Sequence, residues 1–439
     1  MQTSSHRLTR RGLLAAVGAA AAATAAGCAG PGTVRGGSAR GARASAPPPL
    51  GSGPVSGSLS FAHWRAEDRK VFDEVIASFV RANPGASVRQ DISPSNDYQS
   101  TALRKVQGGA IGDVFTAFRG SQFVDMVKAG LFTDLSPQTF TDNYLPKLVR
   151  GGKDIAGRQL GLPYQLVFNM PVANVALLEK AGVSEPPPDW DGFLAMCEKL
   201  KSRGTAALAW PGGEPANAGQ LLNAMVMNNA PWDDMFARIE SGTAKATDDW
   251  FVTTLRQYAQ LRPYFQPNAT GASSEPCQQL FARGRAAMLA TGSFHLGPVR
   301  QLGATFPVDM IAPITVPKGK ARYQGIYNAT FILGVNTGSH HAEAATAFVR
   351  HLSTPEVATR YANETTQHVT VADATYTNKD LRATAHWLTA PTLLAPRFQF
   401  DDLDMRAAVE NAAVAVVGGT APEQAAEAAQ KTVDQRRRA

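Results

Sequence analysis

The sequence predicts an α/β protein with two lobes, and three observations lead to this prediction. Short apolar strands alternate with amphipathic helices along the chain, which favours a parallel sheet with helices on both faces. The alternating part is about 380 residues long, which is more than one compact core usually holds. The alternation is interrupted at Gly161-Leu162-Pro163-Tyr164 and then resumes. We therefore expect one α/β lobe on each side of this interruption.

The expected first lobe opens with a strand near residues 59–61, which ends in the pair His63-Trp64. Apolar residues then recur with helical spacing over 71–80, and Asn83-Pro84-Gly85 ends that helix. The expected elements that follow are a strand at 88–92, a helix at 97–107, a strand opening at 113 and a helix at 121–129.

The expected second lobe repeats this alternation without any internal sequence repeat. Its expected elements are a helix at 172–180, a rigid proline loop at 186–188, an amphipathic helix at 190–201 and a short strand at 206–210. An apolar strand is expected at 331–335, after Tyr327 and Asn328.

Residues 1–27 are typical of a signal peptide. A basic head is followed by an alanine-rich apolar run and then by small residues. The apolar run is too short for a comfortable transmembrane helix, which needs about 20 apolar residues. Arg10 and Arg11 stand directly before the run and resemble a twin-arginine export signal. We therefore expect the protein to be exported.

Residues 28–57 are expected to form a lipidated start and a flexible tether. Ala25-Ala26-Gly27-Cys28 resembles a lipobox, with Ala25 where leucine is usual; the alternative is a chance cysteine. Lipid chains on Cys28 would anchor the protein to the outer face of the cell membrane, because stable anchoring takes more than one chain. The stretch after it is rich in Gly, Ser, Ala and Pro, as flexible linkers are.

The positive charge lies outside the expected lobes. The formal net charge is +7, but nine arginines lie in the leader, in the tether and at the end of a basic tail at 431–439; residues 1–57 and 436–439, which hold these nine, contain no Asp or Glu. Without them the body carries about −2, whereas a nucleic-acid binder carries its basic patch on the folded domain. We expect no nucleic-acid partner. Cys197 and Cys277 remain in the body, either paired or as two buried thiols.

Several motifs occur in an order that resembles a known family. They are Gly112-Asp113-Val114-Phe115, Val127-Lys128-Ala129-Gly130-Leu131, Gly161-Leu162-Pro163-Tyr164, Leu177-Leu178-Glu179-Lys180-Ala181-Gly182, the expected helix from Phe281 to Met288, and Gly292-Ser293-Phe294. In this order the body resembles the extracellular solute-binding proteins of ABC sugar importers, the group that includes maltose-binding protein.

This resemblance implies a two-lobed periplasmic-binding-protein fold of type II-like topology, with a hinge and discontinuous lobes. We expect lobe 1 at 58–165 plus 308–355 and lobe 2 at 166–307 plus 356–430. It also implies a monomer that takes a sugar in the cleft and delivers it to membrane permease subunits. No cofactor and no metal are expected.

A sugar site needs aromatic rings against the sugar's apolar faces and polar side chains for its hydroxyls. Such residues should stand on strand-end loops that face a cleft. The expected ligand-binding residues are His63, Trp64, Arg119, Tyr164, Gln165, Trp210, Phe294, Tyr327 and Asn328. Core packing remains the alternative for the aromatic residues, and a surface charge for Arg119.

Catalysis is the competing class of function. An exported glycoside hydrolase would need two carboxylates beside the scissile bond, and no convincing pair stands out. The sequence also lacks a G-x-S-x-G elbow, an H-E-x-x-H pair and a Walker lysine loop. A surface sensory or adhesion protein on the same fold is the third possibility. We expect a binding protein rather than an enzyme.

Overall fold

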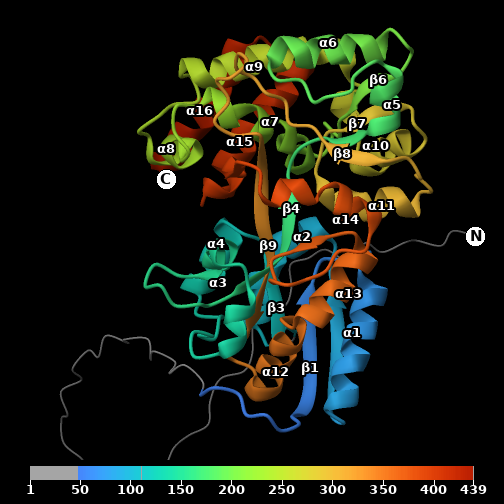
Figure 1. Ribbon diagram of the computed structural model, residues 1–439. Coiled ribbons are helices and arrows are strands. Elements are labelled where there is room, and N and C mark those ends of the chain that lie inside the picture. Colours follow the sequence, from blue (N-terminus) through green and yellow to red (C-terminus); the bar gives the residue numbers. More distant parts are fainter. Residues whose placement is uncertain (1–47, 110, 439) are drawn as a thin grey trace, which may run out of the picture. The chain divides into compact units, whose positions relative to one another are not determined.

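The computed structural model describes residues 48–109 and 111–438 (Figure 1). The expected signal peptide and Cys28 lie outside these residues. The strands are β1 (Ser56–His63), β2 (Gly85–Ile92), β3 (Val114–Ala117), β4 (Leu162–Phe168), β5 (Val172–Asn174), β6 (Ala206–Ala209), β7 (Ala286–Leu289), β8 (Val308–Met310), β9 (Gly325–Val335), β10 (His368–Val369) and β11 (Thr392–Leu394).

The α-helices fall into two groups along the chain. The first runs α1 (Arg69–Ala82), α2 (Ser95–Gln107), α3 (Ser121–Lys128), α4 (Pro146–Val149), α5 (Val175–Lys180), α6 (Trp190–Lys201), α7 (Pro215–Asn229) and α8 (Met235–Ser241). The second runs α9 (Asp249–Gln260), α10 (Ser274–Ala282), α11 (Leu296–Gln301), α12 (Ala342–Leu352), α13 (Pro355–Thr365), α14 (Lys379–Ala383), α15 (Leu403–Val417) and α16 (Pro422–Arg438). Among the described residues, no helix is both long enough and apolar enough to cross a membrane.

The larger sheet has the strand order β10-β4-β9-β3-β1-β2, with β11 beside β9. The expected parallel pairing is confirmed for β1 with β2 and β3. It is also confirmed for β11 with β9. It is wrong for the other pairs of this sheet, because β9 runs antiparallel to both β3 and β4, and β10 runs antiparallel to β4. The reason is topological: β4 leaves this sheet towards the second lobe and β9 returns from it.

The expected helix at 71–80 is confirmed as α1, whose apolar face buries Val71, Phe72, Val75 and Phe79. Asn83 ends α1: its Nδ2 donates to the Phe79 carbonyl at 2.9 Å, and its Oδ1 accepts from the Val55 amide at 3.0 Å. Val55 is buried and β1 begins at Ser56, so the expected tether does not extend to residue 57.

The second sheet has the order β6-β7-β5-β8. Two expected helices begin or end elsewhere. Residues 172–174 form β5 between β7 and β8, and α5 starts only after Asn174, whose side chain accepts from the Leu177 amide. The segment from Phe281 to Met288 is the end of α10 followed by β7. A short apolar run can form either a buried strand or a helix. In these two segments the residues pair with neighbouring strands and therefore form β5 and β7.

Two separate hydrophobic cores define the lobes. One core contains buried residues from Val55 to Tyr164, except Leu148, and from Phe331 to Leu381; the other contains Leu148 and buried residues from Leu166 to Ala329 and from Trp387 to Val433. The chain therefore crosses between lobes within β4, within β9 and after α14. Figure 1 shows β4 and β9 running side by side from one lobe into the other.

The expected lobe boundaries need correction at two places. Residues 308–330 belong with lobe 2, because β8 pairs with β5 and Ile326 packs in its core. Residues 356–381 belong with lobe 1, because α13 packs Val357 and Tyr361 into that core. From here on, lobe 1 means residues 48–165 and 331–383, and lobe 2 means 166–330 and 384–438.

The expected basic tail at 431–439 is also corrected, because residues 431–438 continue α16. Val433 is fully buried in the core of lobe 2. Arg436 forms an ion pair with Asp402, with Nη2 and Oδ2 2.8 Å apart. The apolar spacing of Ala425, Ala426, Ala429 and Val433 holds this helix against the lobe, so its arginines are only the exposed face of a packed element.

Candidate functional site

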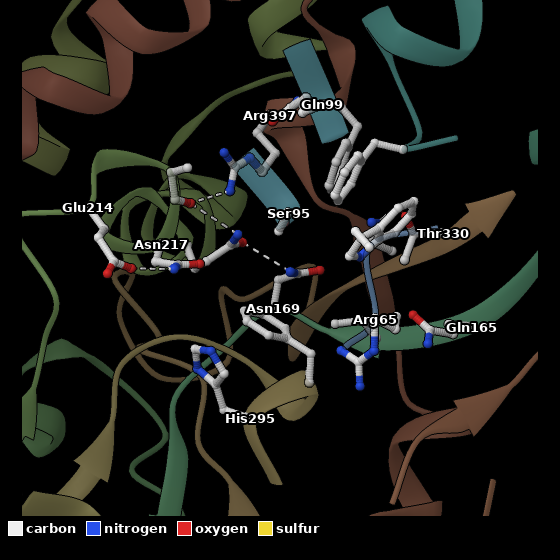
Figure 2. Close-up of a pocket in the computed structure, with 18 of the residues that line it drawn as sticks. Arg65, Ser95, Gln99, Gln165, Asn169, Glu214, Asn217, His295, Thr330 and Arg397 are labelled. Atoms are coloured by element: carbon white, nitrogen blue, oxygen red, sulfur yellow. Dashed lines mark hydrogen bonds between the residues drawn. The ribbon is translucent and has the colours of Figure 1, made fainter. Parts of the chain in front are cut away.

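A cavity of about 470 Å³ lies between the lobes and is lined from both of them. Lobe 1 contributes Trp64, Arg65, Ala66, Glu67, Pro94, Ser95, Gln99, Phe118 and Gln165. Lobe 2 contributes Val167, Asn169, Glu214, Ala216, Asn217, Gln220, Phe294, His295, Asn328, Thr330, Arg397, Phe398 and Arg406. The lining residues of β4 and β9, together with Asn169 directly after β4, are called the floor of the cavity. Figure 2 shows ten of the lining residues labelled around the cavity.

Aromatic side chains provide the apolar part of the cavity wall. Trp64, after β1, stacks on Phe118, after β3, with ring centroids 3.7 Å apart and an angle of 17° between the rings. Phe294 stands on the opposite side, on a short 3-10 turn, Ser293–His295. Flat aromatic surfaces in a half-enclosed site can cover the C–H faces of a ligand ring.

Arg65 and Gln165 are fixed by one buried network. Arg65 donates to both carboxylate oxygens of Asp68 at 2.8 and 3.1 Å and pairs with Glu67 at 2.9 Å. The Tyr361 hydroxyl donates to Asp68 at 2.6 Å and accepts from Gln165 Nε2. Burial opposes the charge of Arg65, but the two carboxylates outweigh it and raise its pKa. Arg65 therefore stays cationic at the cavity wall.

Three buried oxygens that line the floor have no hydrogen-bond partner among the described residues. They are Asn169 Oδ1, Asn328 Oδ1 and Thr330 Oγ1. The amide nitrogen of Asn169 fixes the orientation of this side chain, because Nδ2 donates to Gln220 Oε1 at 3.0 Å (Figure 2). A buried polar atom without a partner costs about 1–3 kcal/mol, so these oxygens favour a ligand with hydroxyl donors.

Glu214 and His295 form the polar part of the lobe 2 wall. Burial alone would raise the pKa of Glu214, but hydrogen bonds from the Ser274 hydroxyl and amide and from Asn217 lower it. Burial and then the charge of Arg65 lower the pKa of His295 to about 3. Its Nδ1 lies 2.8 Å from Thr291 Oγ1. At neutral pH this wall presents a carboxylate beside a neutral imidazole.

The structure brings together four of the expected ligand-binding residues: Trp64, Gln165, Phe294 and Asn328 all line the cavity. His63 and Tyr164 are fully buried instead and do not line it. His63 Nε2 lies 2.9 Å from Gln90 Oε1, and the Tyr164 ring packs on Tyr361 at 5.2 Å. These two side chains support the cavity wall from behind.

Strand geometry separates the remaining expected residues. Tyr327 and Asn328 lie inside β9 rather than before it, so their side chains point to opposite faces. Asn328 faces the cavity, whereas Tyr327 does not line it. The ammonium of Lys147 lies 5.8 Å from the centroid of the Tyr327 ring. Arg119 is also absent from the lining and lies against Gly151.

The expectation that Trp210 offers a face to the ligand is wrong. Its side chain is fully buried in lobe 2, stacked on Phe265 with centroids 5.0 Å apart. Its Nε1 donates to the Ala218 carbonyl at 3.0 Å. The turn after β6 folds back over the indole: a Cβ on Gly212 would lie 2.5 Å from Trp210 Cζ3. Trp210 is therefore a core residue.

Sequence reasoning missed the residues that supply most of the cavity's polar groups, namely Arg65, Asn169, Glu214, Asn217, His295, Thr330, Arg397 and Arg406. Alternation could have found two of them, because Asn169 follows Gln165 and Thr330 follows Asn328 with even spacing. Arg65 and His295 directly follow the expected residues Trp64 and Phe294, so their position in the sequence was a usable signal. Glu214, Asn217, Arg397 and Arg406 stand on helices and turns that only tertiary packing brings to the cavity.

The family to which the chain belongs can be assigned by comparison with known proteins. Residues 64–359 match the sequence profile of the family described as bacterial extracellular solute-binding protein. The chain belongs to this family. In this solute-binding protein the matched part begins at Trp64 on the cavity wall and ends within α13.

Individual relatives are distant. A putative binding protein of Brucella abortus is 22% identical over 287 residues, which cover 62% of this chain and 66% of that protein. A multiple sugar-binding protein of Streptococcus mutans is 22% identical over 312 residues, covering 69% and 72%. The solved structure of the solute-binding protein RafE with raffinose has a TM-score of 0.76 at 16% identity, covering 87% of this chain and all of that one. This likeness confirms the two-lobed α/β fold.

Proposed function

We propose that this protein captures a sugar or oligosaccharide in the cavity between its lobes and delivers it to the permease subunits of an ABC importer. One observation carries the proposal: the cavity combines the Trp64–Phe118 stack with buried, unpartnered oxygens on the crossing strands. Such a site suits a ligand that has apolar ring faces and a rim of hydroxyl donors. The sugar ligands named for the Streptococcus relative and for RafE support it.

The protein acts in this proposal as a monomer held at the outer face of the cell membrane through lipid on Cys28, after export on a twin-arginine signal. The lobes close on the ligand by bending at the crossing segments. The closed form is then recognised by the permease, and ATP hydrolysis belongs to another subunit.

Glycoside hydrolysis is the competing proposal, and the cavity does not favour it. A hydrolase needs one carboxyl whose raised pKa keeps it protonated as the general acid. The carboxyls that line the described cavity are Glu67 and Glu214. Glu67 is paired with Arg65, and the pKa of Glu214 is lowered. Glu214 is therefore not prepared as a proton donor, and the Glu67 carboxylate is held by the Arg65 guanidinium.

A ligand panel tests this proposal. The mature protein is heated with raffinose, maltotriose, chitin oligosaccharides and a wider saccharide set, and the melting temperature is recorded. A ligand at 100 times its dissociation constant adds about 2.7 kcal/mol of stability, so a binder raises the melting temperature. The saccharide is then recovered and analysed. An unchanged saccharide supports capture, whereas shortened products would establish hydrolysis.

A matched pair of variants locates the site. Asn169→Ala removes a cavity-lining oxygen and should weaken binding, whereas Asn363→Ala alters an amide of lobe 1 outside the cavity. Equal binding by both variants would place the ligand somewhere else.

A further inference from the structure

The lobe 2 side of the cavity holds two arginines and one glutamate in a buried cluster. Arg397 stands on a 3-10 turn, Pro396–Gln399, and Arg406 and Glu410 stand one helical turn apart on α15. Their side chains are 5%, 11% and 2% exposed. Both arginines line the cavity.

Glu410 is already engaged on both of its oxygens. Oε1 accepts from Asn223 Nδ2 at 3.1 Å, and Oε2 accepts from Arg397 Nη2 at 3.1 Å. The carboxylate also sits against the backbone of α7, where a Cβ on Gly219 would lie 2.6 Å from Glu410 Cδ. Glu410 therefore cannot turn to form a second close pair.

The arginines keep unused donors. Arg397 Nη1 donates to the Ala216 carbonyl at 2.5 Å, but its Nε has no partner among the described residues. Arg406 Nε is 4.0 Å from Glu410 Oε2, which is beyond hydrogen-bond distance. No side-chain hydrogen bond of Arg406 is found in the described part of the chain.

The cluster carries an excess of one positive charge, because two guanidinium groups share one carboxylate. Outside the cluster, Glu67 and Asp68 pair with Arg65, and Glu214 accepts from Ser274 and Asn217; among the described residues none of these three carboxylates forms an ion pair with Arg397 or Arg406. Burial and then the charge of Arg397 lower the pKa of Arg406 to about 10, so it remains a cation at neutral pH. A buried charge without a close counter-ion is unfavourable.

We infer that the ligand carries an anionic group, a carboxylate or a phosphate on a polyhydroxylated body, and that Arg406 together with Arg397 binds this group. The inference rests on the proposed function and narrows the ligand from sugars in general to acidic sugars. A guanidinium fork matches the two oxygens of such a group, and the new pair neutralises the excess charge. A hydroxyl could accept one hydrogen bond there but would leave that charge uncompensated.

Matched ligand pairs test the inference by calorimetric titration. Galacturonate oligosaccharides are compared with neutral galactose oligosaccharides of equal length, and glucose 6-phosphate is compared with glucose. The acidic member of at least one pair should bind roughly tenfold to a hundredfold more tightly, as expected for a hydrogen-bonded charge pair. The pair that shows the preference tells carboxylate from phosphate. Raising the salt concentration should reduce the preference.

Three variants test whether the preference for the acidic ligand depends on the cluster of Arg397, Arg406 and Glu410. Arg406→Gln should abolish the preference for the acidic member, and Arg406→Lys, which keeps the charge but loses the fork, should retain part of it. Arg256→Gln removes an arginine that is 52% exposed on α9 and should leave the preference intact.

A ligand-free measurement gives an independent readout. Because Arg406 is the uncompensated charge, Arg406→Gln should raise the melting temperature of the ligand-free protein, whereas Arg256→Gln should not. A lower melting temperature for Arg406→Gln would contradict the inference.

The outcomes separate this inference from the proposed function. If only neutral saccharides bind, or if acidic members bind no better, the acidic ligand is refuted while sugar capture stands. If nothing in either panel binds, the proposed function fails and this inference fails with it.

Discussion

Trp64 and Trp210 both follow a β-strand, yet their side chains lie in different surroundings. Trp64 stacks on Phe118 at the cavity wall, whereas Trp210 is enclosed by Phe265 and the turn through Gly212. Loss of Trp64 should therefore affect ligand affinity as well as stability, whereas loss of Trp210 should affect stability alone.

The corresponding variants separate these two roles. Trp210→Ala should cost about 3–5 kcal/mol of folding stability, because it leaves a cavity in the core, and should leave ligand affinity nearly unchanged. Trp64→Ala should weaken ligand binding through the loss of a stacking surface, and it should also lower stability, because Trp64 packs against Tyr98 and Phe331 in the core of lobe 1. Urea denaturation and calorimetry on the same preparations measure both quantities. A Trp210→Ala protein with full stability and lost affinity would reverse the assignment made here.

His295 gives the stability a pH dependence whose sign can be worked out. Its pKa falls from an ordinary 6.5 to about 3 in the folded protein, mainly through burial, so the unfolded chain binds the proton more readily. The stability that the folded protein keeps by holding His295 neutral is fully present above pH 6.5, and it is lost as the pH falls towards 3.

Between about pH 6 and pH 4, wild type should lose roughly 1.4 kcal/mol per pH unit more than His295→Gln. Urea unfolding across this range measures the difference. If the free energy of unfolding of both proteins changes equally with pH, His295 takes up its proton as readily in the folded protein as in the unfolded chain. His63 and His368, whose pKa values burial lowers to about 4, are retained in both proteins and cancel in the comparison.

At the scale of elements, β4 and β9 decide which residues face the cavity. Their alternation places Gln165, Asn169, Asn328 and Thr330 on one side and sends Tyr164 and Tyr327 to the other. The sequence motif located the correct strands, because glycine, proline and aromatic residues mark the crossing. It could not predict which side chains of these strands face the cavity, because this depends on the pairing of β4 with β9, two segments about 160 residues apart.

The C-terminal helix α16 is a second element whose role depends on packing. Val433 is buried in lobe 2, while Arg438 at the end of α16 is exposed. Val433→Ala should destabilise the protein by about 1–3 kcal/mol, whereas Arg438→Ala should have almost no effect. Urea denaturation of both variants measures this. A Val433→Ala protein as stable as wild type would indicate that 431–438 behaves as the solvent-exposed tail that the arginines alone suggest.

At the scale of the molecule, length and alternation were enough to predict two α/β lobes. The boundaries at 308 and 355 could not be predicted, because the short strand β8 and the amphipathic helix α13 each have an apolar side that would suit either core. Only the pairing of β8 with β5 and the packing of Tyr361 beside Phe72 assign them. The cluster of Arg397 and Arg406 could not be predicted from neighbouring residues either. It depends on α7, where Asn223 donates to Glu410 and the Ala216 carbonyl accepts from Arg397.

The central claim is that the cavity between the lobes is where the ligand is captured. A crystal structure with the saccharide that most raises the melting temperature tests it most directly. We expect ligand density in this cavity, with a ring against Trp64 or Phe294 and hydroxyls within hydrogen-bond distance of Asn169 Oδ1 and Asn328 Oδ1. Density for the saccharide at any other surface, with the cavity free of it, would show that the ligand is captured elsewhere.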